Sequence, residues 1–149
     1  MRDRPMNAAD WIRAGVVGFA SASILAVVIV PLIVTGMAQI PKPIAQVVTE
    51  ALLGREVSLA AGMAFHFVYY MAISIAAIAI LRDRLTLRAS MILGLLLWLV
   101  ALFALAPFAG WGPLGLSQGP EFFIASFVPN ALYGLLLWAL YRLAFASGR

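Results

Sequence analysis

The chain has 149 residues, of which 64% are hydrophobic and only 11% are charged. Soluble domains carry about 25% charged residues, so this composition excludes a separate aqueous domain. Ten basic and six acidic residues give a formal net charge of +4 at pH 7 in an otherwise apolar chain. We interpret that excess as a signal of membrane topology rather than of nucleic-acid binding. No cysteine is present, which excludes disulfides, thiol catalysis and thiolate metal sites.

Four long apolar stretches fill most of the sequence, at residues 14–39, 57–81, 89–107 and 121–141. At about 1.5 Å per residue, each is long enough to cross roughly 30 Å of bilayer hydrocarbon. Because lipid offers no hydrogen-bond partners to the backbone, each crossing should be an α-helix. The sequence therefore predicts an all-α, polytopic membrane protein, a four-helix bundle that forms one transmembrane domain over residues 1–149.

A shorter helix is predicted between the first two crossings, at residues 44–53. Ile44, Val48 and Leu52 recur at helical spacing, and polar side chains occupy the other face. Gly54 is placed to end the helix. The pattern is typical of a helix that lies flat at the membrane surface, and it fits a docking helix for a partner equally well.

Basic residues are unevenly divided between the two sides of a four-crossing arrangement. One side carries Arg2, Arg4, Arg13, Arg82, Arg84, Arg88, Arg142 and Arg149. The other side carries only Lys42 and Arg55. The positive-inside rule then predicts that both termini are cytoplasmic. The first stretch is longer than the apolar core of about 7–15 residues in a signal peptide, so we expect it to be retained as a membrane helix.

Small residues recur at every fourth position of the first stretch, at Ala14, Gly18, Ala22 and Ala26. They would make a smooth helix-packing face along which another helix can approach closely. Such a face serves packing within one chain and contact with a partner or a second copy alike, so both interpretations stay open here.

An internal repeat is indicated by residues that match at constant spacing. Gly18, Pro31 and Gly36 correspond to Gly94, Pro107 and Gly112 at an offset of 76 residues. In the second and fourth stretches, His66 and Tyr69 correspond to Asn130 and Tyr133 at an offset of 64. Each half would be a two-helix hairpin, and because each contains an even number of crossings the two halves would be parallel.

The sequence offers no set of residues for catalysis. Every carboxylate lies at a helix end or in a loop, so paired acid and base groups have no place inside the membrane. A zinc site would need three or four ligands that the chain does not supply together. We therefore expect a protein that is not an enzyme and that has no catalytic residue and no metal site.

A polar seam is predicted at mid-membrane depth. It comprises His66, Asn130, Tyr69, Tyr133 and Ser126. In one interpretation His66, the only histidine, donates a structural hydrogen bond to Asn130, Ser126 or a tyrosine. In a second, the seam is a path for protons or a small solute, with His66 titrating. In a third, His66 is an axial ligand of a tetrapyrrole, haem or chlorophyll, with Gly62 leaving room for the macrocycle.

Two short motifs carry a family resemblance, His66-Phe67-Val68-Tyr69-Tyr70 and Pro129-Asn130-Ala131-Leu132-Tyr133-Gly134. With the order of the apolar stretches, they resemble small bacterial four-helix inner-membrane proteins of the YagU kind. In that family a histidine is usual at the position of Asn130 and a glycine at that of Tyr70. The resemblance implies an architecture and not an activity.

The function that these features predict is that of an accessory or assembly subunit of a larger membrane complex. The alternative is a small oligomeric transporter or channel for a proton or small solute, lined by His66 and Asn130. The expected partners are the lipid bilayer and either another membrane protein or further copies of the chain, with no nucleic acid. No cofactor is required, although a lipid or a quinone could occupy the groove between the two repeats.

Overall fold

The computed structural model describes residues 5–38 and 40–146, and within them all regular structure is helical. The helices are α1 (Ala8–Val34), α2 (Ile44–Leu53), α3 (Leu59–Leu81), α4 (Leu87–Val100), α5 (Ala106–Phe108) and α6 (Glu121–Ala146). The 3₁₀-helices η1 (Arg82–Arg84) and η3 (Pro113–Gln118) and the π-helix η2 (Ala101–Leu105) connect them. Four helical spans are long and apolar enough to cross a membrane, at Ala8–Val34, Leu59–Arg84, Leu87–Phe108 and Glu121–Phe145. The chain is a multi-pass membrane protein.

Polar caps fix where three of the long helices begin. Asn7 and Asp10 form a capping box at the start of α1, in which each side chain accepts the other's backbone N–H. Ser58 caps α3 and Thr86 caps α4 in the usual way. Because of its cap, α1 begins at Ala8 rather than at residue 14. It ends at Val34 rather than at residue 39, just before Gly36, whose φ is +73°.

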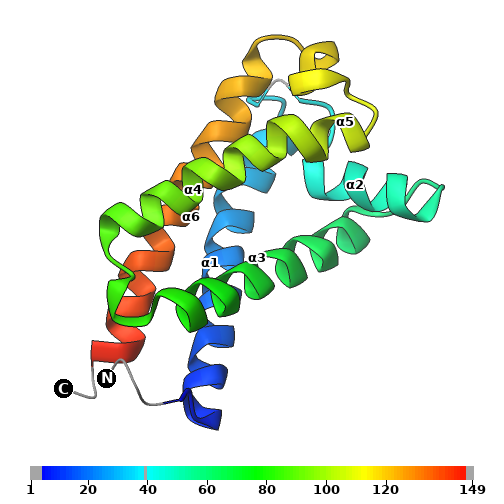
Figure 1. The fold of residues 1–149 in the computed structure, drawn as a ribbon. Helices are drawn as coiled ribbons and strands as arrows, with labels where there is room; N and C mark the ends of the chain where they lie inside the picture. Colours follow the sequence, from blue (N-terminus) through cyan, green and yellow to red (C-terminus); the bar gives the residue numbers. More distant parts are fainter. Residues whose placement is uncertain (1–4, 39, 147–149) are drawn as a thin grey trace.

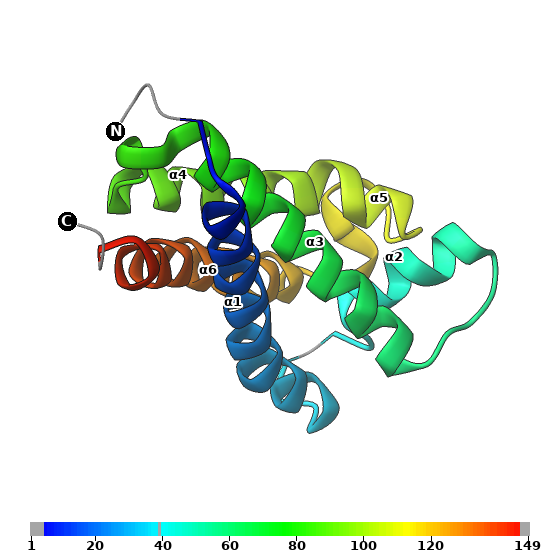
Figure 2. The same ribbon diagram turned by 90° about the horizontal axis from the view of Figure 1, so that it is seen from below.

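The long helices pack in pairs, with α1 against α3 and α4 against α6, and α1 also contacts α6. Figures 1 and 2 show α3 crossing α1 obliquely and diverging from α4, which it barely contacts. Few residues of α3 therefore lie close to α4. The start of α1, the end of α3 and the end of α6 lie together at one end of the molecule, and the loops with α2 and η3 lie at the other (Figure 1).

Glycines mark the closest approach in both main helix pairs. A Cβ on Gly18 would lie 2.7 Å from the Cα of Met71 in α3. A Cβ on Gly94 in α4 would lie 2.5 Å from the backbone oxygen of Asn130 in α6. Real Cβ atoms do not come so close, so only glycine permits these backbones to meet.

The short helix α2 packs into the opening between α3 and α5 rather than lying wholly at the surface. Ala45 and Val48 are buried, whereas Leu52, which the pattern placed on the apolar face, is 58% exposed. Gly62 allows the close contact, since a Cβ there would lie 2.6 Å from the Cα of Gln46. The Gln46 side chain donates to the backbone oxygen of Val57, which fixes α2 on α3.

The third span is interrupted by the π-helix η2, just before Pro107. In it, the Ala106 N–H donates to the Ala101 carbonyl, a five-residue step. Proline has no N–H and its ring crowds the carbonyl four residues earlier, so a wide turn at this point relieves the clash. Beyond it, Trp111 packs edge-to-face against Phe122 at 5.3 Å between ring centres.

Candidate functional site

His66 is held by the backbone of α1. Its Nε2 lies 3.0 Å from the carbonyl oxygen of Ala22. A carbonyl only accepts, so Nε2 carries the proton, and Nδ1 of the neutral ring is an acceptor. The partner expected from the sequence was Asn130, Ser126 or a tyrosine. The difference arises because Ala22 has too small a side chain to separate α1 from α3.

A second polar contact lies about two turns further along α3. The hydroxyls of Ser74 and Tyr133 are 2.8 Å apart, and both residues are fully buried. The Tyr70 ring lies between this pair and His66, with ring centres 4.6 Å from Tyr133 and 4.8 Å from His66. Tyr69 is only half-buried and stacks on Phe65 instead. The sequence selected Tyr69, whereas Tyr70 is the tyrosine beside His66.

A hydrogen bond within α6 joins the Asn130 side chain to the backbone of Ser126. The Asn130 side-chain amide donates to the Ser126 carbonyl at 2.7 Å. The Ser126 hydroxyl donates to the Phe123 carbonyl at 3.2 Å and accepts from Trp98 Nε1 at 3.1 Å. The indole thereby links α4 to α6, a role that the sequence did not indicate for Trp98.

Two small cavities, of about 90 Å³ and about 60 Å³, are both lined by His66, Tyr70 and Asn130. We call these three residues the polar cluster. The larger lies between α1 and α6 and also contacts Ser126, while the smaller lies under α2 and also contacts Tyr69. The structure thus brings His66 and Asn130 to the same cavities without a hydrogen bond between them. A helical period counted from His66 passes through Tyr70 and Ser74, and this signal could have found both residues.

The predicted helix-packing face is used inside the chain. Ala14 and Ala22 have no exposed surface, and Gly18 is buried against α3. Ala26 is partly buried and lines the larger cavity. The small residues of α1 therefore pack against the neighbouring helices of the same chain.

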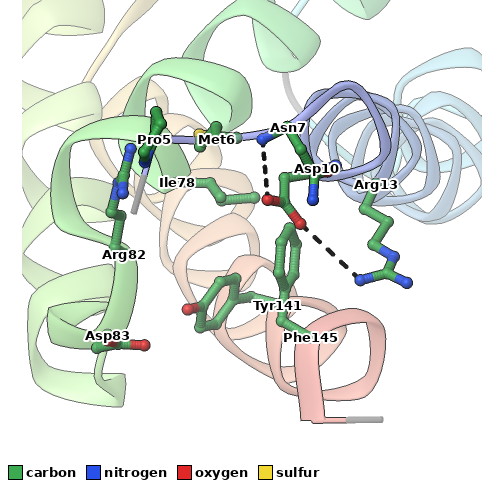
Figure 3. Close-up of a pocket in the computed structure, with 10 residues that line it drawn as sticks. All are labelled: Pro5, Met6, Asn7, Asp10, Arg13, Ile78, Arg82, Asp83, Tyr141 and Phe145. Atoms are coloured by element: carbon green, nitrogen blue, oxygen red, sulfur yellow. Dashed lines mark hydrogen bonds and ion pairs between the residues drawn. The ribbon is translucent and has the colours of Figure 1, made fainter. Parts of the chain in front are cut away.

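A separate pocket of about 230 Å³ lies at the opposite end of the molecule, where α1 begins (Figure 3). Its walls come from the first turns of α1, from the end of α3 with η1, and from the end of α6. The Asp10 carboxylate accepts from the Asn7 backbone and lies 3.9 Å from an Arg13 guanidinium nitrogen. Asp83 and Tyr141 also line the pocket, so its polar groups have mixed charge.

Within the described ranges, no three histidine or acidic side chains come together as a metal site would require. The polar cluster instead offers hydrogen-bonding groups in apolar surroundings, a setting suited to holding a small uncharged group.

The fold and the site define a four-span helical membrane protein with a small, mostly apolar cavity that contains the polar cluster. Comparisons with protein-family models, curated proteins and solved structures give no match to this chain. No relative therefore assigns a role to the polar cluster.

Proposed function

We propose that this protein is a non-catalytic accessory or assembly subunit of a larger complex in the bacterial inner membrane. In this proposal both termini are cytoplasmic and the four spans form an open bundle of two parallel hairpins. The distribution of charge supports the orientation. Arg13, Arg82 and Arg142 belong to the end where α1 begins and α6 finishes, whereas Lys42 and Arg55 flank α2 at the other end.

The two-hairpin arrangement has support from corresponding glycines. Gly18 and Gly94, which match in the proposed repeat, are each the point of closest approach in their helix pair. Gly36 and Gly112, the next matching pair, each have a φ of +73° after the outer end of a span. Equivalent positions therefore perform equivalent structural roles in the two halves.

The sparse contact between α3 and α4 is the observation that carries the proposed subunit role. These consecutive spans barely contact each other. The half-buried Tyr69 lines the small cavity between them and has no hydrogen-bond partner for its hydroxyl among residues 5–38 and 40–146. An aromatic hydroxyl at this depth is best satisfied by another polar group, so an inserted helix of a partner protein would complete the packing.

Site-specific photo-crosslinking in native membranes tests this role. A benzophenone amino acid is placed at Tyr69, with a matched probe at Val27 of α1, which is 75% exposed. We expect the Tyr69 probe to give one discrete, larger adduct that co-purifies in mild detergent, and the Val27 probe to give lipid adducts only. Lipid adducts alone at both positions would contradict the subunit role.

The transporter alternative has in its favour a cavity lined by His66 and Asn130. The core beyond it is filled, however, because Tyr133, Ser74 and Leu137 are fully buried toward the end where α6 finishes. A continuous path would require these side chains to move. The tetrapyrrole alternative has less support, since His66 Nε2 is bonded to Ala22 and a cavity of about 90 Å³ is far smaller than a macrocycle.

A further inference from the structure

We infer that the polar cluster is the headgroup site for a membrane quinone, bound as quinone or quinol, whose apolar tail lies in a groove between α1 and α6. This groove, the α1–α6 groove, has a volume of about 320 Å³ and is lined in part by Ile29, Ile33, Ile124, Ala125 and Val128. The inference does not depend on the proposed subunit role, because it concerns a ligand of this chain alone.

The groove and the inner cavity adjoin each other. Ile29, Ile33, Ile40, Ala125 and Pro129 line both of them. At the mouth, Met37 is 75% and Ile124 is 71% exposed, so the groove opens on the apolar exterior near the outer ends of α1 and α6. A lipophilic molecule can therefore enter from the bilayer and reach His66 without crossing water.

The polar cluster has unused hydrogen-bonding capacity. Within the described chain, His66 Nδ1, the Tyr70 hydroxyl and Asn130 Oδ1 have no partner, while the other nitrogens of His66 and Asn130 bond the backbone. None of the three atoms is sealed off, because Ser90 Oγ is the sole unpaired side-chain atom that is fully buried among the described residues. A purely hydrocarbon ligand would leave these groups unpaired, which costs free energy.

The lining also excludes a charged headgroup. The described residues around the inner cavity and the cavity under α2 include no Lys, Arg, Asp or Glu. An isolated carboxylate or phosphate would lose its hydration here without gaining a counter-ion, at a high cost in free energy. The ligand's head must therefore be neutral and able to both accept and donate hydrogen bonds.

A quinone or quinol head meets these requirements together. The Tyr70 hydroxyl can donate to a quinone carbonyl, and His66 Nδ1 or Asn130 Oδ1 can accept from a quinol hydroxyl. The rings of Tyr70 and Phe122, both of which line the cavity, suit a flat ring. The inner cavity of about 90 Å³ and the cavity under α2 of about 60 Å³ share His66, Tyr70 and Asn130, so the quinone ring would occupy both of them.

Quinone binding is measured by quenching of tryptophan fluorescence in nanodiscs titrated with decylubiquinone, since Trp98 and Trp111 pack against residues of the cavity. Tyr70→Phe removes a hydroxyl without an intrachain partner, and Ala125→Leu fills the groove. We expect saturable quenching in the wild type and an apparent Kd at least tenfold higher in both variants. Tyr133→Phe, whose hydroxyl is bonded to Ser74, and Ala72→Leu on an exposed face should keep the wild-type Kd.

A second measurement does not require an added ligand. Organic extracts of the purified wild-type protein should contain an isoprenoid quinone in near-stoichiometric amount by mass spectrometry, and extracts of Ala125→Leu should be depleted of it. Quenching without saturation, or with the same Kd in all variants, would show partitioning into lipid and overturn the inference. So would a diacylglycerol or a sterol-like alcohol that is retained by the protein when quinone is not.

Discussion

Single residues decide how closely these helices approach. At Gly94 the nearest atom to an added Cβ is a backbone oxygen of α6, which cannot rotate away as a side chain would. At Gly15, by contrast, nothing lies within 4 Å of an added Cβ. Gly94 therefore limits how closely its helix packs, whereas Gly15 does not.

We predict that Gly94→Ala destabilises the protein by about 1–3 kcal/mol, because α4 and α6 must separate to admit the methyl group. The matched variant Gly15→Ala should be neutral or slightly stabilising, since alanine favours helix more than glycine does. Unfolding in mixed detergent micelles, titrated with SDS and followed by circular dichroism, measures both. Equal stability of the two variants would refute the close contact.

The sequence singled out His66 and Asn130, because polar groups deep in apolar helices stand out by type. It did not identify the partner of His66, since a backbone carbonyl such as that of Ala22 has no signature in the sequence. Tyr70 was missed because its neighbour Tyr69 matched Tyr133 in the proposed repeat. The i to i+4 spacing from His66 to Tyr70 was the stronger guide to a shared face.

At the scale of elements, Glu50 holds α2 to the segments that precede it and follow it, partly by charge. Lys42 Nζ lies 2.9 Å from Glu50 Oε1, and the same carboxylate oxygen accepts from the Val57 backbone N–H at 3.3 Å. The hydrogen bond from Lys42 lowers the pKa of Glu50 below its ordinary value of 4.5, and the same bond raises the pKa of Lys42 above 10.5. The ion pair is therefore intact across neutral pH.

These pKa shifts predict how the anchoring of α2 depends on pH. A carboxylate with a lowered pKa contributes stability above its unfolded pKa and loses it as the pH falls through the lower, folded value. We expect the hydrogen-exchange protection factor of the Val57 amide to fall below about pH 4.5. In Glu50→Gln the protection factor should be low and flat over the same range. The effect should be modest because the pair is partly exposed to solvent.

The helices themselves were predictable, whereas their arrangement was not. Apolar length alone locates the four spans, because in lipid a chain has no other way to satisfy its backbone. The divergence of α3 from α4, and the insertion of α2 beside Gly62, depend on contacts between residues far apart in sequence. The early start of α1 was missed because the apolar criterion ignores the capping pair Asn7 and Asp10.

At the scale of the whole molecule, the exterior of the spans is largely apolar. Only 22–33% of each span's most apolar window is buried inside the protein. Large side chains such as Val27, Ile80 and Leu143 are more than two-thirds exposed. Such surfaces are stable against acyl chains and not against water. The polar parts of the molecule therefore lie at the ends of the spans, and the sides of the spans are apolar.

We predict that Glu56 lies on the outer side of the cell membrane and Asp83 on its cytoplasmic side. The chain has no cysteine, so the single-cysteine variants Glu56→Cys and Asp83→Cys have no background reaction. Both positions are exposed in the structure. A membrane-impermeant maleimide should label the first variant in intact cells and the second only after permeabilisation. The reverse labelling pattern would show that the topology is the opposite of the one proposed. The α1–α6 groove would then open toward the cytoplasmic side of the membrane.

The wide turn before Pro107 determines which way the side chains beyond it point around the axis of the third span. A π-turn holds one residue more than an α-turn, so everything beyond it is rotated by about 100° relative to an unbroken spiral. Beyond this turn Trp111 packs against Phe122, and Phe122 in turn lines the inner cavity. The shape of the inner cavity therefore depends partly on an irregular turn in the third span, which contributes none of the polar groups of the cavity.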